Sequence, residues 1–357
     1  VCFIGKPFAD GGAFYRSKKT RESHAGWYVL IGICAAVPCL MVLVLLLMSA
    51  DMVFADLLVR FAGVFRFPAK LLRILLMLVF GFLSSYCGVR YVQKHAADIK
   101  PSAGKTAEPL IAIAFTAPIA VLYLLFSAIQ IVYLFIGNMQ LPAGVTYAEY
   151  ARRGFFQLLF VCVLNLAAVL FIQSYFKENR VLKALLLAIS GCTLIMTASS
   201  ACRMLLYIRA YQLTFLRVSV LVALAVIALL MAGVIAKIVK PQFPLFRYGF
   251  VLAGAVYLVF SFSHVDYFIA AYNLTHTSWE ASGEETVDYS YLYTLSTDAA
   301  PAIEKYAGKS GAADYRKQGW YQLYCEANEE ALNATGLRTY NVSHAVAKQL
   351  LMEDNRE

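Results

Sequence analysis

Charged and tyrosine side chains gather at two points in an otherwise apolar sequence of 357 residues. At the first point Glu149 lies four residues before Arg153, so the two share one face of a helix, with Arg152 beside them. A carboxylate and two guanidinium groups could bind a charged ligand. The T-x-x-E spacing that ends at Glu149 is also that of a capping box, which predicts a helix start with Tyr147 and Tyr150 in the aromatic belt of a membrane.

The second point follows a long apolar segment. Arg203 and Tyr207 are four residues apart on one helical face, and Arg217 comes after the next turn. Cationic groups in this arrangement could bind phosphate or carboxylate. The plainer interpretation is that these long basic side chains snorkel to lipid headgroups at the end of a membrane helix.

The sequence gives little evidence for a metal site or for a known catalytic motif. His264, Asp266 and His276 could bring three metal-type ligands together, but their spacing matches no zinc pattern. The motifs H-E-x-x-H, G-x-S-x-G and G-x-x-x-x-G-K-[ST] do not occur. We therefore expect no metal and no cofactor, and we favour a protein that is not an enzyme.

The composition indicates what kind of protein must position these side chains. Hydrophobic residues make up 61% of the chain and charged residues 15%, and the mean hydropathy is +0.64. Soluble domains carry about 25% charged residues. Six of the eight cysteines lie inside apolar segments, which argues against a disulfide framework. The chain is expected to be a polytopic helical membrane protein.

Seven apolar runs are each long enough to cross the roughly 30 Å hydrocarbon core as a helix. They cover residues 26–50, 71–91, 110–136, 154–175, 183–206, 217–239 and 246–263. Charged residues mark their ends; for example, no acid or base lies between Arg153 and Lys177. The segment from Met52 to Phe67 has helical spacing but too many charges to span, so we expect it to lie in the membrane interface. These runs predict an all-α fold with about seven transmembrane helices.

Polar residues inside these runs are few. Gln130, Asn165 and Gln173 are the strongly polar ones, and Asn165 is suited to an interhelical hydrogen bond. Proton-coupled carriers place carboxylates inside the membrane. The runs contain none, which argues against such a carrier.

The basic residues indicate an orientation. Outside the C-terminal region, 15 lysines and arginines fall on the side of the N-terminal tail and 9 on the other. The positive-inside rule then places the tail in the cytoplasm and the C-terminal region outside. We expect a multi-pass protein of a bacterial cytoplasmic membrane whose partner is the lipid bilayer, with anionic lipids at the cytoplasmic face. The net charge of +9 gives no reason to expect nucleic acid.

Residues 264–357 differ from the rest of the chain. They hold 14 of the 22 acidic but only 7 of the 31 basic residues. Their patterns predict short helices near 288–295, 298–307, 321–332 and 343–351. We therefore divide the chain into a basic cytoplasmic tail (1–25), a transmembrane domain (26–263) and an acidic, mainly helical extracytoplasmic domain (264–357). Because it begins with Val1 and shows no signal peptide, we expect further residues before it.

Several short motifs resemble one known family. They are TYAEYARRGFF at 146–156, SADMVF at 49–54, RMLLY at 203–207, YQLTFLR at 211–217 and DYFIAAYN at 266–273. The chain resembles the uncharacterised bacterial membrane protein family known as domain of unknown function 4173, which is related to domain of unknown function 4153. The resemblance implies an inner-membrane, many-helix protein without a known activity. It adds Asp51, Asp266 and Asn273 to the candidate positions.

Two residues depart from the family pattern. Gln212 stands where a glycine is expected before Leu-Thr, and His264 stands where a small polar residue is expected before the Asp. The tight turn and the local geometry at these two positions therefore do not follow from the resemblance.

Three functions remain open from the sequence. The leading hypothesis is binding, sensing or transport of an envelope-side ligand. The second is a membrane enzyme acting on a lipid-linked or envelope substrate, with Glu149, Asp266 or Asp51 as acid or base and Arg203 or Arg217 holding phosphate. The third is a scaffold whose acidic C-terminal domain docks a protein partner.

Overall fold

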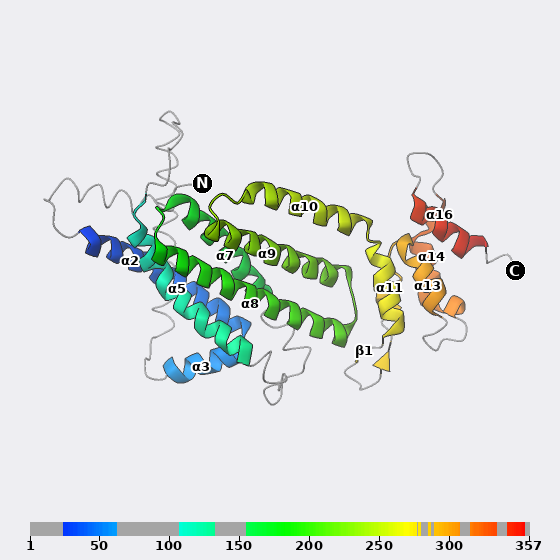
Figure 1. Ribbon diagram of the computed structural model, residues 1–357. Helices are drawn as coiled ribbons and strands as arrows, with labels where there is room; N and C mark the ends of the chain where they lie inside the picture. The colour runs from blue at the N-terminus through cyan, green and yellow to red at the C-terminus, as the bar shows by residue number, and fades with distance from the viewer. Residues whose placement is uncertain are drawn as a thin grey trace, which may run out of the picture. The chain divides into compact units, whose positions relative to one another are not determined.

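The computed structural model describes residues 24–62, 107–132, 155–276, 278–279, 285–286, 289–307, 315–333 and 341–353. Within these ranges six helices are long and apolar enough to cross a membrane (Figure 1). They are α2 (His24–Ala50), α5 (Pro109–Gln130), α7 (Phe155–Tyr175), α8 (Arg180–Tyr211), α9 (Phe215–Val239) and α10 (Leu245–Phe262). The all-α, multi-pass fold is thus confirmed. The span expected at 71–91 lies outside the described residues.

The chain divides into two compact units. Unit 1 comprises Val1–Gln140, Arg153–Ser200 and Ile227–Leu245, and unit 2 comprises Leu141–Arg152, Ala201–Val226 and Phe246–Glu357. Helices α8 and α9 each contribute one part to each unit.

In unit 1, α2 packs along α5 and against α7, and the short helix α3 (Met52–Ala62) follows α2 (Figure 1). Residues 52–62 of the predicted interfacial segment are therefore helical, and residues 63–67 lie outside the described residues. Phe54 of α3 is fully buried and meets Phe126 of α5 edge to face, with 5.1 Å between the ring centroids. This contact, with the buried side chains of Leu47 and Leu158, forms part of the apolar core of unit 1.

Gly32 allows α2 to approach α5 closely. A Cβ atom at this position would lie 2.6 Å from both the Cβ of Ala114 and the carbonyl oxygen of Ile111. Real Cβ atoms do not approach backbone that closely, so a side chain here forces the two helices apart. Small residues at such crossings are a common device of membrane helix pairs.

We predict that Gly32→Ala lowers the free energy of unfolding by about 1–3 kcal/mol through overpacking. Gly191→Ala is the matched control, because a Cβ at Gly191 on α8 meets nothing within 4 Å. Alanine there is expected to stabilise the helix slightly. Unfolding by SDS titration in mixed micelles measures both, and equal midpoints for the two variants would contradict the close approach.

Unit 2 contains the last part of α8, the first part of α9, nearly all of α10 and a set of short helices. Helix α11 (Val265–Thr275) follows α10, and a two-residue antiparallel pair, β1 (Ser278–Trp279) with β2 (Glu285–Thr286), comes next. The remaining elements are α12 (Tyr289–Leu292), η2 (Thr297–Ala299), α13 (Ala300–Tyr306), η4 (Tyr315–Lys317), α14 (Gly319–Ala327), α15 (Glu329–Asn333), α16 (Val342–Lys348) and η5 (Gln349–Glu353). These confirm the predicted helical character of the region.

The core of unit 2 is formed by α11 with the short helices that follow it. Ile269, Leu292, Ile303 and Tyr324 are fully buried there. Helix α10, by contrast, has no buried residue among its eighteen. An apolar helix with so many exposed side chains is stable only against lipid or another protein, which agrees with its length and hydropathy as a candidate membrane span.

Candidate functional site

The first predicted cluster cannot be placed. Tyr147, Glu149, Tyr150, Arg152 and Arg153 lie in the segment 133–154, outside the described residues. The other candidates fall in two places.

Asp51 lies in unit 1, at the junction of α2 and α3. Its carboxylate is 3% exposed and accepts two hydrogen bonds, from the Phe54 backbone N–H at 2.9 Å and from Gln130 Nε2 at 2.9 Å. The first bond makes Asp51 the N-cap of α3. Gln130 in turn accepts from Ser199 Oγ of α8 at 2.6 Å. A buried carboxylate is thus the first member of a polar chain that joins α2, α5 and α8.

A second buried polar chain lies in the same unit. Tyr123 of α5 donates to Asn165 Oδ1 of α7 at 2.6 Å, and Asn165 Nδ2 donates to Thr193 Oγ1 of α8 at 3.0 Å. The predicted interhelical role of Asn165 is therefore confirmed. In lipid such bonds are worth about 1 kcal/mol each, so this chain fixes which helix faces meet more than it adds stability.

In unit 2, Asn273 joins α11 to the turn between α8 and α9. Its side-chain oxygen accepts from the Leu213 N–H at 2.8 Å, and its Nδ2 donates to the Leu213 carbonyl at 2.9 Å. Asn273 is 1% exposed, so both polar groups of the Leu213 peptide depend on it. The neighbouring Gln212 donates through its amide to the carbonyls of Asn273 at 3.3 Å and His276 at 2.7 Å.

Gln212 and His264 have left-handed backbone conformations, with φ of 64° and 46°. They are the two departures from the family pattern. The expected glycine at 212 would adopt this conformation without strain. Glutamine instead accepts the strain and contributes two hydrogen bonds through its side chain.

This balance predicts a difference between two substitutions. Gln212→Ala loses both hydrogen bonds and keeps the strain, so it should lower the free energy of unfolding by about 1–2 kcal/mol. Gln212→Gly loses the same bonds but relieves a left-handed strain of about 1 kcal/mol. In SDS titration the glycine variant should therefore unfold at the higher SDS concentration of the two. The opposite order would show that the strained backbone is not present in solution.

Of the two cationic candidates, Arg217 on α9 contacts the same turn. The Arg217 guanidinium donates to the carbonyl of Tyr211, the last residue of α8, and to that of Gln212, the first residue of the turn. It also lies 4.4 Å from the centre of the Tyr207 ring. A cation at a helix C-terminus satisfies carbonyls that have no helical partner. Arg203 is fully buried, which differs from the snorkelling interpretation.

Asp266 joins α11 to the short helix η2. Asp266 Oδ2 accepts from the Ser296 N–H at 3.1 Å and from the Ser296 hydroxyl at 2.6 Å. The Ser296 carbonyl accepts from the Tyr324 hydroxyl at 2.9 Å. Burial raises the pKa of Tyr324, so this hydroxyl stays protonated and able to donate.

A hollow of about 660 Å³ lies beside these contacts, and we call it the α10–α16 hollow. His264 Nδ1 lies 3.4 Å from Asp298 Oδ2 in its wall, and the imidazole side chain is 61% exposed. Apolar and hydroxyl groups complete the lining: Phe262, Tyr267, Phe268, Pro301, Val342, Val346, Ser263, Thr297 and Ser343. Within the described part of the chain, no group of three or more His, Cys, Asp or Glu side chains could hold a metal ion.

Sequence analysis missed several of these residues. Ser199 and Thr193 were missed, because nothing local in the sequence distinguishes a serine or threonine that will pair from one that will not. The one usable signal was a polar residue inside an apolar run, and that signal did identify Gln130 and Asn165.

Comparison with known proteins gives a family and no activity. No curated protein and no solved structure matches the chain. The family model described as Domain of unknown function (DUF4153) matches residues 1–306. The resemblance suggested by the sequence motifs put the 4173 family first and 4153 as its relative, and the match corrects that order. Since it covers most of the sequence and reaches α13, the chain belongs to the family Domain of unknown function (DUF4153).

Proposed function

We propose that this membrane protein binds an amphiphilic ligand from the envelope side, in the α10–α16 hollow. The observation that carries the proposal is the combination of volume and lining. A hollow of about 660 Å³ is within the range of small-molecule sites, which are mostly apolar with a few polar groups to orient the ligand.

The exposed apolar side chains support this choice. Phe262 is 78% exposed, Phe268 61% and Val342 64%, and all three line the hollow. Apolar side chains grouped around a concave surface mark an interaction site more often than scattered ones do. We infer that the apolar part of the ligand lies against them.

The charged groups that line the hollow indicate the chemistry of the polar part of the ligand. Asp298 lines the hollow, and its side chain is 29% exposed. The ion pair with His264 holds this carboxylate only while the imidazole is protonated. A primary amine or a hydroxyl group on the ligand would bind Asp298 in place of the imidazole. The acidic composition of residues 264–357 favours an amine.

Sensing fits the hollow better than catalysis. His264 stands at the joint between α10 and α11 with a left-handed backbone, and it also forms the wall of the hollow. A ligand that displaces its imidazole from Asp298 would act directly on this joint. The conformation of the joint at the end of α10 would then differ between the occupied and the empty hollow.

Dansylcadaverine tests the proposal, because it carries an apolar fluorophore and a primary amine. With the full chain in nanodiscs, the probe should show a saturable rise in emission above empty nanodiscs. Asp298→Asn removes the charge that holds the amine and should weaken binding about tenfold. Val346→Trp fills the hollow and should abolish the saturable part.

Glu326→Gln is the control for this experiment, because Glu326 is a carboxylate of the same unit that does not line the hollow. Its binding should equal that of the wild type. If all variants bind the probe as empty nanodiscs do, or if Glu326→Gln weakens binding as much as Asp298→Asn, the proposal is wrong.

A further inference from the structure

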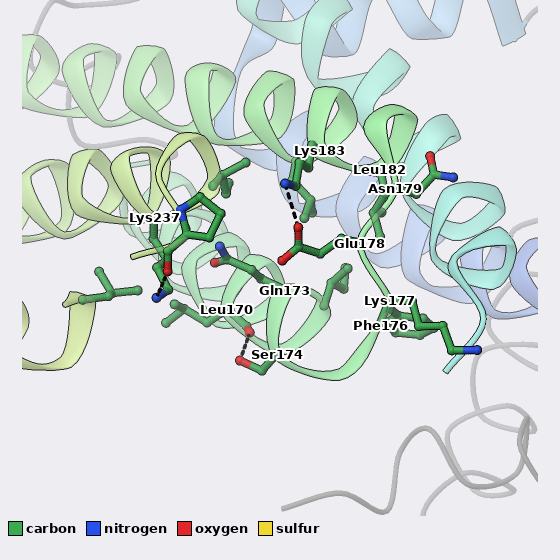
Figure 2. A pocket seen from close by; sticks show the side chains of 15 residues that line it. Leu170, Gln173, Ser174, Phe176, Lys177, Glu178, Asn179, Leu182, Lys183 and Lys237 are labelled. Carbon is green, nitrogen blue, oxygen red and sulfur yellow. Dashed lines mark hydrogen bonds and ion pairs between the residues drawn. The ribbon is translucent and has the colours of Figure 1, made fainter. Parts of the chain in front are cut away.

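A second hollow, in unit 1, carries an inference that is independent of the proposed ligand site. It has a volume of about 350 Å³ and lies where α7 ends, α8 begins and the α9–α10 turn passes, and we call it the lysine hollow (Figure 2). Its lining includes three lysines, Lys177, Lys183 and Lys237, and one acid, Glu178.

The lysines differ in what they contact. Lys177 pairs with Glu108 at 2.7 Å and points away from the hollow in Figure 2. Lys183 pairs with Glu178 at 2.8 Å. Lys237 donates to the backbone carbonyl of Pro241 at 2.5 Å, which is a neutral acceptor, and among the described residues it forms no ion pair with an acidic side chain. The hollow therefore retains positive charge, concentrated at Lys237.

The other walls are apolar. Leu182, Leu186 and Ile238 are at most 4% exposed and form the deep side, with Leu170 and Leu245 nearer the opening. Gln173, the third polar residue expected inside a span, also lines the hollow and carries an amide that can donate (Figure 2). The geometry thus combines a cation and an amide with an apolar wall.

We propose that the lysine hollow binds one anionic phospholipid. The phosphodiester would accept from Lys237, Lys183 and the Gln173 amide, and an acyl chain would lie against Leu182 and Ile238. Lysine is a common ligand of phosphate, and basic sites at the ends of membrane helices recruit anionic headgroups. The excess of lysines over acids favours an anionic over a zwitterionic headgroup.

The position of the hollow agrees with this ligand. Residues 176–179 join α7 to α8 and residues 240–244 join α9 to α10, so the hollow lies at one end of four membrane helices. It is the end that the positive-inside rule assigns to the cytoplasmic leaflet. The Lys177–Glu108 pair and the backbone bond from Lys177 N–H to Ala107 O at 3.1 Å fix the α7–α8 connection there.

Native mass spectrometry of the full chain, released from detergent with added lipid, tests the proposal. Phosphatidylglycerol should give a single saturable adduct. Its intensity should be at least about fivefold that of the phosphatidylcholine adduct. Lys237→Gln should weaken the phosphatidylglycerol adduct about fivefold. Gln173→Leu, which leaves every charge in place, should weaken it about threefold.

Lys240→Gln is the matched control, because Lys240 is exposed, lies three residues from Lys237 and does not line the hollow. It should change the adduct less than twofold. Equal losses in Lys237→Gln and Lys240→Gln would show general surface attraction and overturn the proposal. A specific adduct with inorganic phosphate alone would also overturn it, since the ligand would then be the free ion.

Discussion

Asn273→Ala is expected to lower the free energy of unfolding by about 3 kcal/mol, because it leaves the Leu213 N–H and carbonyl without their shared partner. Asn273 is 1% exposed and bonds both groups, at 2.8 and 2.9 Å. The turn between α8 and α9 should therefore separate from α11 at a lower SDS concentration. Asn273→Asp keeps the acceptor but loses the donor, and it should fall between alanine and wild type.

Asn333→Ala is the control for the Asn273 variants, because Asn333 is an exposed asparagine of the same unit, at the end of α15. We expect its unfolding midpoint to equal that of the wild type. If Asn273→Ala shifted the midpoint no more than Asn333→Ala, the contact between α11 and the turn would not contribute to stability.

Asp51→Ala is expected to have the second large effect, a loss of about 3 kcal/mol from the missing N-cap of α3 and the unsatisfied Gln130 amide. Asp51→Asn should lose about 1 kcal/mol or less, since asparagine also caps helices and a flipped Gln130 amide can accept from it. The measurement is again SDS titration, with far-UV circular dichroism to follow helix loss.

Asp56→Ala is the control for the Asp51 variants, because Asp56 lies on the same helix α3 with a side chain that is 79% exposed. Its pair with Arg60 is a surface ion pair of the kind that contributes little. An effect as large for Asp56→Ala as for Asp51→Ala would contradict the buried polar chain.

The membrane helices could be predicted because each is specified by its own residues. The run without charge between Arg153 and Lys177 is long enough to span, and α7 occupies Phe155–Tyr175 as a candidate span. The same local logic predicted a helix after Asp51 and the short helices of residues 264–357. Hydropathy and end charges are sufficient for this level of structure.

The polar contacts could not be predicted, because their partners are far apart in sequence. Gln130 lies 79 residues from Asp51, and Asn273 lies 60 from Leu213. The sequence identified Asp51 and Asn273 as candidates through family motifs and Gln130 through its polarity. Which residue each would contact depends on helix packing, and no local pattern encodes that.

The backbone at Gln212 illustrates the same limit. A glycine expected at this position suggested a tight turn, and the glutamine made that uncertain. The structure keeps the left-handed turn and uses the longer side chain to bond α11. These hydrogen bonds compensate for the backbone strain, and they could not be predicted because the carbonyls of Asn273 and His276 are far from Gln212 in sequence.

An envelope-side ligand requires that the α10–α16 hollow be reached from outside the cell, and cysteine labelling measures this directly. In a cysteine-free chain, Ser343→Cys introduces a thiol in the wall of that hollow, and Lys177→Cys introduces one beside the lysine hollow. In intact cells a membrane-impermeant maleimide should label position 343 rapidly, more slowly when dansylcadaverine is present, and should not label position 177. Labelling at position 177 with protection at position 343 would place the hollow in the cytoplasm and contradict an envelope-side ligand.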